Sequence, residues 1–331
     1  MGAYLVRRLL CAVLLFFGLA TVTFVIFFVL PHTTPAPRRR APFPIGPPLG
    51  LHGSVVDNYV HFLSKIVHAD LGTSTVNGHS VATIVTTAAP ITAGLVLGGA
   101  VIWLAIAIPL GLLCALRPSS RAGKAGGVLA VLGLSLQPLW LGLVLSWLFG
   151  DVLGWFPPGG YCDTLGPEPD CGGPLPWAYH MAPPWTAFAL IYGAAYVRLV
   201  RGRSHETLRD SHVRTARAKG VSEWAILRSH VLPSTVRPML SALVLDLGGM
   251  AFGLIGVSMF VEVAFGIPGL GRTTAQAAVR GDSPVLIGVL LFVAATVAFA
   301  NLVAELFATL LDPRTRVGRA PTRVSAATPR P

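Results

Sequence analysis

Charged residues are scarce in this chain. Asp, Glu, Lys and Arg together make up 12% of its 331 residues, against the roughly 25% usual for soluble globular domains. Hydrophobic residues account for 53%, and the mean hydropathy is +0.68. This composition argues against a soluble domain and indicates a membrane protein.

A phosphate-binding loop is missing as well. The pattern G-x-x-x-x-G-K-[ST] does not occur, and the only Gly-Lys pair, Gly123-Lys124, is followed by Ala125. Without the glycine-rich loop that cradles nucleotide phosphates, the chain offers no ATPase site of its own. We expect no catalytic residue, no metal and no cofactor in this chain.

Long apolar runs are what the sequence has in abundance. Six of them are long enough to form helices that cross a hydrocarbon core, which takes about 20 residues. The first three contain no charged residue, whereas the fourth opens on Pro183-Pro184 and closes near Arg198. The runs predict an all-α integral membrane protein with six transmembrane helices, at residues 9–30, 91–116, 128–149, 183–200, 239–262 and 284–311.

The first run has an alternative reading as a secretory signal, because Arg7 and Arg8 precede it. Its 22 residues exceed the roughly 7 to 15 of a signal's apolar segment. No clean A-x-A cleavage site follows it. We therefore expect a retained membrane helix.

The basic residues predict the orientation of these spans. With the N-terminus inside, nineteen Lys and Arg fall in cytoplasmic segments and six in outer ones. This is a positive-inside bias, although the run Arg38-Arg39-Arg40 falls in a long outer loop, where the rule weakens. We expect a multi-pass membrane protein with both termini in the cytoplasm. The cytoplasmic segments would be 1–8, 201–238 and 312–331, and the large outer loops 31–90 and 150–182.

The second outer loop contains the cysteine pair Cys162 and Cys171. Outside the cytoplasm two cysteines that close a short loop favour a disulfide, worth about 3 kcal/mol in the chain-entropy model. Two free thiols are the alternative, and a metal site is less favoured because no second ligand pair lies nearby in sequence. Cys11 and Cys114 fall within predicted spans and are expected to be packing residues.

The stretch "TARAKGVSEWAILRSHVLP", residues 215–233, resembles a helix-turn-helix with basic residues. It lies in a loop of about 38 residues between the fourth and fifth predicted spans, which leaves no room for the third helix and core of a DNA reader. Nucleic-acid binding is therefore not expected. Two short helices held beside a membrane bundle would instead dock on another cytoplasmic protein.

The residues of this loop resemble the signature of permease subunits of ABC importers. That signature has the form E-A-A, three residues, G, nine residues, I-x-L-P, and aligning on Gly220 matches Ala216, Leu232 and Pro233. Arg214 replaces the acidic residue and His230 the isoleucine. The octamer "VRTARAKG" at 213–220 is similar to the version in dipeptide and oligopeptide permeases.

The resemblance extends over nearly the whole chain. The segments "YLVRRLL" at 4–10, "ADLGTS" at 69–74, "EVAFGIPGLGR" at 262–272, "GDSPV" at 281–285 and "LDPRTR" at 311–316 are similar to family elements in position and type. The resemblance implies a non-catalytic permease subunit that works with a second permease, with ABC ATPase subunits that bind the ATP, and with an extracytoplasmic substrate-binding protein.

The resemblance implies a coupling role for the loop, and its residues suit a short rigid body. Gly220 would be the left-handed residue that ends the first short helix, Ser222 would begin the second, and Pro233 would stop it. The basic residues have an alternative role in contacting membrane lipid headgroups. The candidate coupling residues are Arg214, Thr215, Ala216, Arg217, Ala218, Lys219, Gly220, Leu232 and Pro233.

Two acidic residues, Asp246 and Glu305, fall within predicted spans. We favour interhelical hydrogen bonding for both, because a charge in the bilayer is costly unless it faces the bundle or water. In an alternative class, an ion-driven secondary transporter, they would carry the ion, but no inverted repeat of broken helices is visible. Within the family resemblance, peptides are the preferred solute and nickel is the alternative.

Overall fold

The computed structural model describes most of the chain. It covers residues 2–30, 54–116, 120–121, 127–128, 133, 135, 137–163, 171–236 and 251–311, and the side chains of 2–8, 251–255 and 304–311 are outside the description. Predicted span 128–149 is thus described only in part, and span 239–262 only from residue 251 onward.

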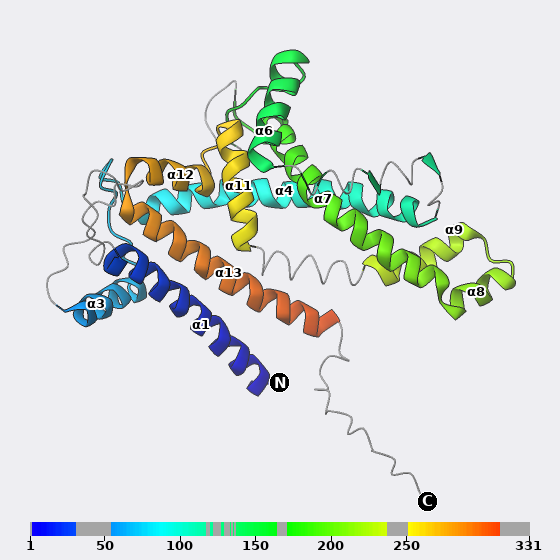
Figure 1. The fold of residues 1–331 in the computed structure, drawn as a ribbon, viewed down its shortest axis with the longest axis horizontal. Coiled ribbons are helices and arrows are strands. Elements are labelled where there is room, and N and C mark those ends of the chain that lie inside the picture. Colours follow the sequence, from blue (N-terminus) through cyan, green and yellow to red (C-terminus); the bar gives the residue numbers. More distant parts are fainter. Residues whose placement is uncertain are drawn as a thin grey trace, which may run out of the picture.

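The described part of the chain is helical and contains no strand, only an isolated bridge between Thr73 and Ser80. Figure 1 shows the arrangement of the helices. In the names that follow, η marks a π-helix. The elements are α1 (Gly2–Phe24), η1 (Val25–Val29), α3 (Val55–Val67), α4 (Val81–Leu116), α6 (Pro138–Ser146), η2 (Trp147–Val152), α7 (Pro174–Arg209), α8 (Ser211–Ala218), α9 (Glu223–Ile226), η3 (Leu227–Val231), α11 (Ala251–Phe265), α12 (Leu270–Arg280) and α13 (Ser283–Leu311).

Three segments among the described helices are long and apolar enough to cross a membrane: Leu9–Val29, Val81–Leu116 and Ser283–Val303. Two shorter apolar helical segments, Pro138–Val152 and Gly256–Phe265, fall within or beside the third and fifth predicted spans. The chain is therefore helical and apolar enough for an integral membrane protein.

Helix α7 extends beyond the fourth predicted span at both ends. Pro183 and Pro184 lie inside α7, not at its start, because the helix begins at Pro174 after Gly173, whose φ is +112°. The N–H of the first helical residue has no acceptor within the helix, so a proline, which lacks this N–H, loses no hydrogen bond there. Pro174 is therefore a favourable first residue. Inside the helix, the Thr186 hydroxyl donates to the Pro183 carbonyl. Helix α4 likewise begins before the second predicted span, since it starts at Val81 and contains Pro90.

Helices α4 and α7 form the centre of the molecule. Glycines on α4 face bulky side chains on α7: a Cβ at Gly99 would lie 2.8 Å from Phe188 Cβ, and one at Gly111 would lie 2.6 Å from Val200 Cβ. The contacts advance in the same direction along both helices, so the pair is parallel. Because these glycines have no side chain, the two helices pack closely, as small residues allow in membrane proteins.

Helices α1 and α13 pack side by side in opposite directions, so that the N-terminal end of α1 lies near the C-terminal end of α13 (Figure 1). The amphipathic helix α3 closes over the other end of α1. There Phe62 packs against Phe24 and Phe28, with ring centroids 5.5 and 5.6 Å apart. These aromatic contacts fix α3 to the first helix.

Candidate coupling site

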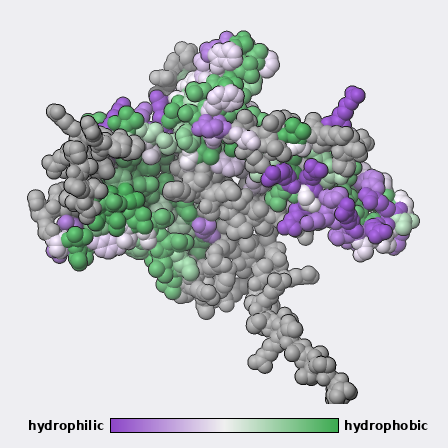
Figure 2. Space-filling model, viewed as in Figure 1, coloured by the Kyte–Doolittle hydropathy of each residue, from purple (hydrophilic) through white to green (hydrophobic). Residues whose placement is uncertain are grey.

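The predicted coupling residues lie in a helical hairpin, residues 211–236, which begins with α8 and continues through α9 and η3. It lies at the far end of α7, where polar residues gather on the surface (Figures 1 and 2). Val213 and Ile226 are buried and belong to the main hydrophobic cluster of the molecule. The α8–α9 hairpin is therefore packed onto the α4–α7 bundle by its own apolar residues.

Gly220 ends α8 in the left-handed conformation, with φ +78°. The Gly220 N–H donates to Arg217 O at 3.0 Å, and the Val221 N–H donates to Ala216 O at 3.2 Å. This pair of bonds is a Schellman motif, which satisfies the last carbonyls of the helix. The prediction of a left-handed glycine at 220 is confirmed.

The second short helix begins at Ser222, whose hydroxyl accepts the Ala225 N–H at 3.3 Å. Arg217 spans the turn between α8 and α9, donating from Nε to Glu223 Oε1 at 2.6 Å and from Nη2 to Oε2 at 3.0 Å. These bonds lower the pKa of Glu223 and raise that of Arg217. Because the pKa of Glu223 is lower in the folded protein than its ordinary value, the ion pair stabilises the turn at pH values above that ordinary value. This stabilisation is lost as the pH falls through the pKa of Glu223 in the folded protein.

Pro233 does not stop the second helix, which corrects the prediction. Helical backbone continues to Val236, with the π-helical turns of η3 immediately before the proline. A proline in a helix removes one hydrogen bond and crowds the carbonyl four residues earlier. The wider π-helical turn takes up that change in bonding.

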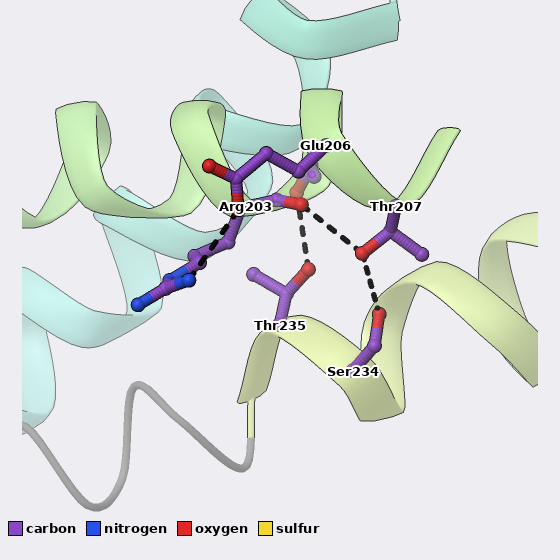
Figure 3. Close-up of polar contacts among 6 residues, drawn as sticks. Arg203, Glu206, Thr207, Ser234 and Thr235 are labelled. Atoms are coloured by element: carbon purple, nitrogen blue, oxygen red, sulfur yellow. Dashed lines mark hydrogen bonds and ion pairs between the residues drawn. The ribbon is translucent and has the colours of Figure 1, made fainter. Parts of the chain in front are cut away.

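Two pairs of hydroxyl groups join the hairpin to the end of α7 (Figure 3). Ser204 Oγ and Thr235 Oγ1 are buried and 3.2 Å apart, and Thr207 Oγ1 and Ser234 Oγ are 3.0 Å apart. We call these four residues the hydroxyl latch. The sequence analysis missed them, because serine and threonine at these positions carry no motif.

Most of the predicted coupling residues face outward. Of the octamer, only Val213 is buried and Ala216 partly buried; Leu232 and Pro233 are also partly buried. The side chain of Trp224, which the sequence analysis did not single out, is 71% exposed on α9. Tryptophan is among the residues most often found as an anchor of a protein interface.

The segment "EVAFGIPGLGR" forms the turn between α11 and α12, and Glu262 organises it. Its carboxylate is fully buried and accepts Thr92 Oγ1–H at 2.7 Å and the Arg272 N–H at 2.9 Å. Thr92 Oγ1 accepts in turn from the Leu270 N–H at 2.8 Å. Helix α4 and the N-terminal end of α12 are thus tied through one carboxylate. A Cβ at Gly271 would collide with the Met259 backbone.

Two further motif segments meet in space. Asp282 of "GDSPV" is buried and accepts from the Ser74 hydroxyl, from the Thr75 N–H at 3.2 Å and from Thr75 Oγ1 at 3.3 Å. Ser74 ends the segment "ADLGTS". The bonds fasten the loop before α4 to the junction of α12 and α13.

The remaining candidates lie elsewhere. Cys162 and Cys171 are joined in a disulfide with Cα atoms 5.1 Å apart, and His180 lies beside it. The sequence analysis missed His180, which only the turn of α7 brings near. Asp246 is outside the described residues, and so is the side chain of Glu305, whose backbone lies in α13.

Comparison with known proteins identifies the kind of protein. Residues 107–317 match the family described as "Binding-protein-dependent transport system inner membrane component". The chain is 32% identical over 269 residues to the Brucella abortus protein named "Putative peptide transport system permease protein", covering 81% of this chain and 82% of that protein. It is 30% identical over 325 residues to the oligopeptide transport system permease protein AppB of Bacillus subtilis, covering 95% and 99%.

The family match covers the α8–α9 hairpin and the turn at Glu262, and its description agrees with the apolar helices of the structure. The chain belongs to the inner membrane component family of binding-protein-dependent transport systems, the permease subunits of ABC importers.

Proposed function

We propose that this chain is the permease subunit of an ATP-driven importer for dipeptides or oligopeptides. Two relatives that align over most of their length are peptide permeases by name, which supports peptides as the solute. The observation that carries the proposal is the α8–α9 hairpin: a small, rigid, charged element packed on the end of a long helix, within the matched family region.

In this proposal the α8–α9 hairpin docks on an ATPase subunit in the cytoplasm. Trp224 would enter a pocket of that subunit, and Arg214 and Lys219, both exposed, would contact its surface. The hydroxyl latch and the buried residues Val213 and Ile226 would pass movement of the hairpin to α7. Binding energy at such a surface concentrates in a few well-packed anchors.

We infer a topology of six spans with both termini in the cytoplasm. The antiparallel packing of α1 and α13 supports it, because the first residues of one and the last of the other lie on one side of the molecule (Figure 1). A second, homologous permease would complete the pathway, and a substrate-binding protein would deliver the solute at the outer side. This chain would then form one wall of a pathway that opens alternately to either side.

The test is uptake of labelled peptide into proteoliposomes that contain the complete complex. We expect uptake to require ATP on the side of the ATPase subunits and to persist when the proton gradient is collapsed. Nickel uptake is measured in parallel, because it would assign the solute to the alternative. Uptake by this chain alone, driven by an ion gradient, would overturn the proposal.

A second test uses the hairpin surface. Trp224→Ala should weaken capture of the ATPase subunits by about tenfold or more, as loss of an aromatic anchor does. Trp155→Ala is the matched control, since this tryptophan is 60% exposed but lies at the other end of α7. Equal capture by both variants would contradict docking through α9.

A further inference from the structure

Three metal-binding side chains meet beside the first turns of α7. Cys162 follows η2, Cys171 precedes α7, and His180 lies within it; their ligand atoms are all within 4.8 Å of one another. The two sulfurs form a disulfide in the structure. We propose that in the dithiol form these sulfurs and His180 bind a thiophilic divalent cation such as Zn²⁺.

The Nδ1 atom of His180 already has the kind of partner that a metal-binding histidine commonly has. Its Nδ1 lies 3.0 Å from Pro176 O, which can only accept, so Nδ1 carries the proton. Metal-bound histidines commonly hold their second nitrogen in this way, by donating to a backbone carbonyl. The lone pair then lies on Nε2, which is 3.6 Å from Cys162 Sγ.

The spacing also suits zinc. With Zn–S bonds of about 2.3 Å and Zn–N bonds of about 2.0 Å, a tetrahedral ion places its sulfur and nitrogen ligands about 3.6 Å apart. Nδ1 is 3.2 Å from the same sulfur, so the ring presents its edge to Cys162. A small ring rotation then turns Nε2 toward an ion that it shares with Cys162.

The backbone holds the two cysteines together independently of their sulfurs. The Gly173 N–H donates to Asp163 O at 3.3 Å, which joins the segments on either side of the pair. Cys162 is buried, which protects a bound ion from water on that side. Three protein ligands leave one tetrahedral position for water or a fourth ligand.

The charge of the surrounding segment favours a cation. Residues 150–182 contain no Lys or Arg and four acidic residues, among them Asp151 and Asp163. Negative charge nearby stabilises both the ion and its binding.

Ion binding and disulfide formation exclude one another. Binding releases one proton from each thiol and transfers no electrons, so two thiolates, one imidazole and a water can surround the ion. Disulfide formation passes two protons and two electrons from the same sulfurs to an oxidant, such as a second disulfide that is reduced to two thiols. An ion bound to the newly made dithiol would therefore delay its oxidation. This inference does not depend on the proposed transport function.

The test uses the full chain in detergent, with Cys11→Ser and Cys114→Ala so that Cys162 and Cys171 are its only thiols. After reduction and anaerobic removal of the reductant, Co²⁺ is added as the probe. We expect one equivalent to bind with thiolate-to-cobalt charge-transfer absorption and tetrahedral d–d bands, and to be displaced by Zn²⁺. The oxidised protein should bind none.

Substitutions distinguish a side chain that binds the ion from one that only lies near it. Cys162→Ser or Cys171→Ser should remove the charge-transfer signal or weaken it severely, and His180→Asn should lower the affinity at least about tenfold. His61→Asn, at an exposed histidine of α3, is the control and should change nothing. The melting temperature of the oxidised His180→Asn variant is compared with that of the oxidised parent protein. Equal melting temperatures show that the variant keeps the fold. Absence of Co²⁺ binding to the reduced parent, or unchanged affinity in a folded His180→Asn, would overturn the proposal.

Discussion

At the scale of single residues, the hairpin depends on backbone conformation at one position. A Cβ at Gly220 would meet no atom within 4 Å, so a larger side chain has space there. The obstacle is φ +78°, a conformation that β-branched residues strongly resist. The backbone conformation, and not a lack of space, therefore favours glycine at position 220.

Gly220→Val should strain the turn by roughly 1–3 kcal/mol and reduce both transport and its coupling to ATP hydrolysis, while membrane insertion stays intact. Gly202→Val is the matched control, because Gly202 also has open space but no positive φ. Gly220→Asn should retain much of the activity, since asparagine tolerates the left-handed region. The measurements are peptide uptake and ATPase rate in the reconstituted complex, and normal coupling in Gly220→Val would contradict the prediction.

Glu262 acts at the same scale in the turn between α11 and α12. Glu262→Ala leaves the Arg272 N–H and the Thr92 hydroxyl without their buried acceptor, which should cost roughly 1–3 kcal/mol per unsatisfied group. We expect a lower melting temperature in detergent. Glu206→Ala, which removes an exposed carboxylate, should melt like the parent. Equal melting of both variants would disprove the role given to Glu262.

At the scale of elements, the hydroxyl latch joins α7 to the hairpin through side chains that are hydrogen-bonded to one another. Ser204→Ala should leave the buried Thr235 hydroxyl without this partner, and Thr235→Val should do the same to Ser204. Replacing both removes both polar groups at once, which is often nearly neutral. We therefore expect the double variant to be less damaged than the sum of the singles.

Hydrogen exchange of residues 204–236 measures this, and the increase in exchange in the double variant should be smaller than the increases of the two single variants added together. Additive increases in exchange would show that the two hydroxyls act independently.

The elements also show how far sequence reasoning reaches. Gly220 and Ser222 were predictable because their roles are local: a glycine ends one helix and a serine begins the next. The bonds of Glu262 and Asp282 were not, because their partners lie 170 and 208 positions away. The position of Pro183 inside α7 was not predicted for a related reason. Local propensity disfavours proline within a helix, but the packing of α7 on α4 keeps the helix continuous.

At the scale of the whole molecule, the inferred orientation assigns each end of α7 to one side of the membrane. In a chain without its native cysteines, Val76→Cys, on the exposed loop before α4, should react with a membrane-impermeant maleimide in intact cells. His205→Cys, near the hairpin, should react only after the membrane is opened. The reverse pattern would require the opposite topology.

The two prolines inside α7 have a mechanical consequence. Each lacks the N–H that would bond the carbonyl four residues earlier, so the helix is softest around Tyr179 and His180. From Pro184 to Arg209 the helix is a rod about 38 Å long. A tilt of about 5° at the soft point would swing the hairpin end by about 3 Å. Helix α7 thus has the form of a lever that bends beside the cysteine pair and moves the hairpin at its other end.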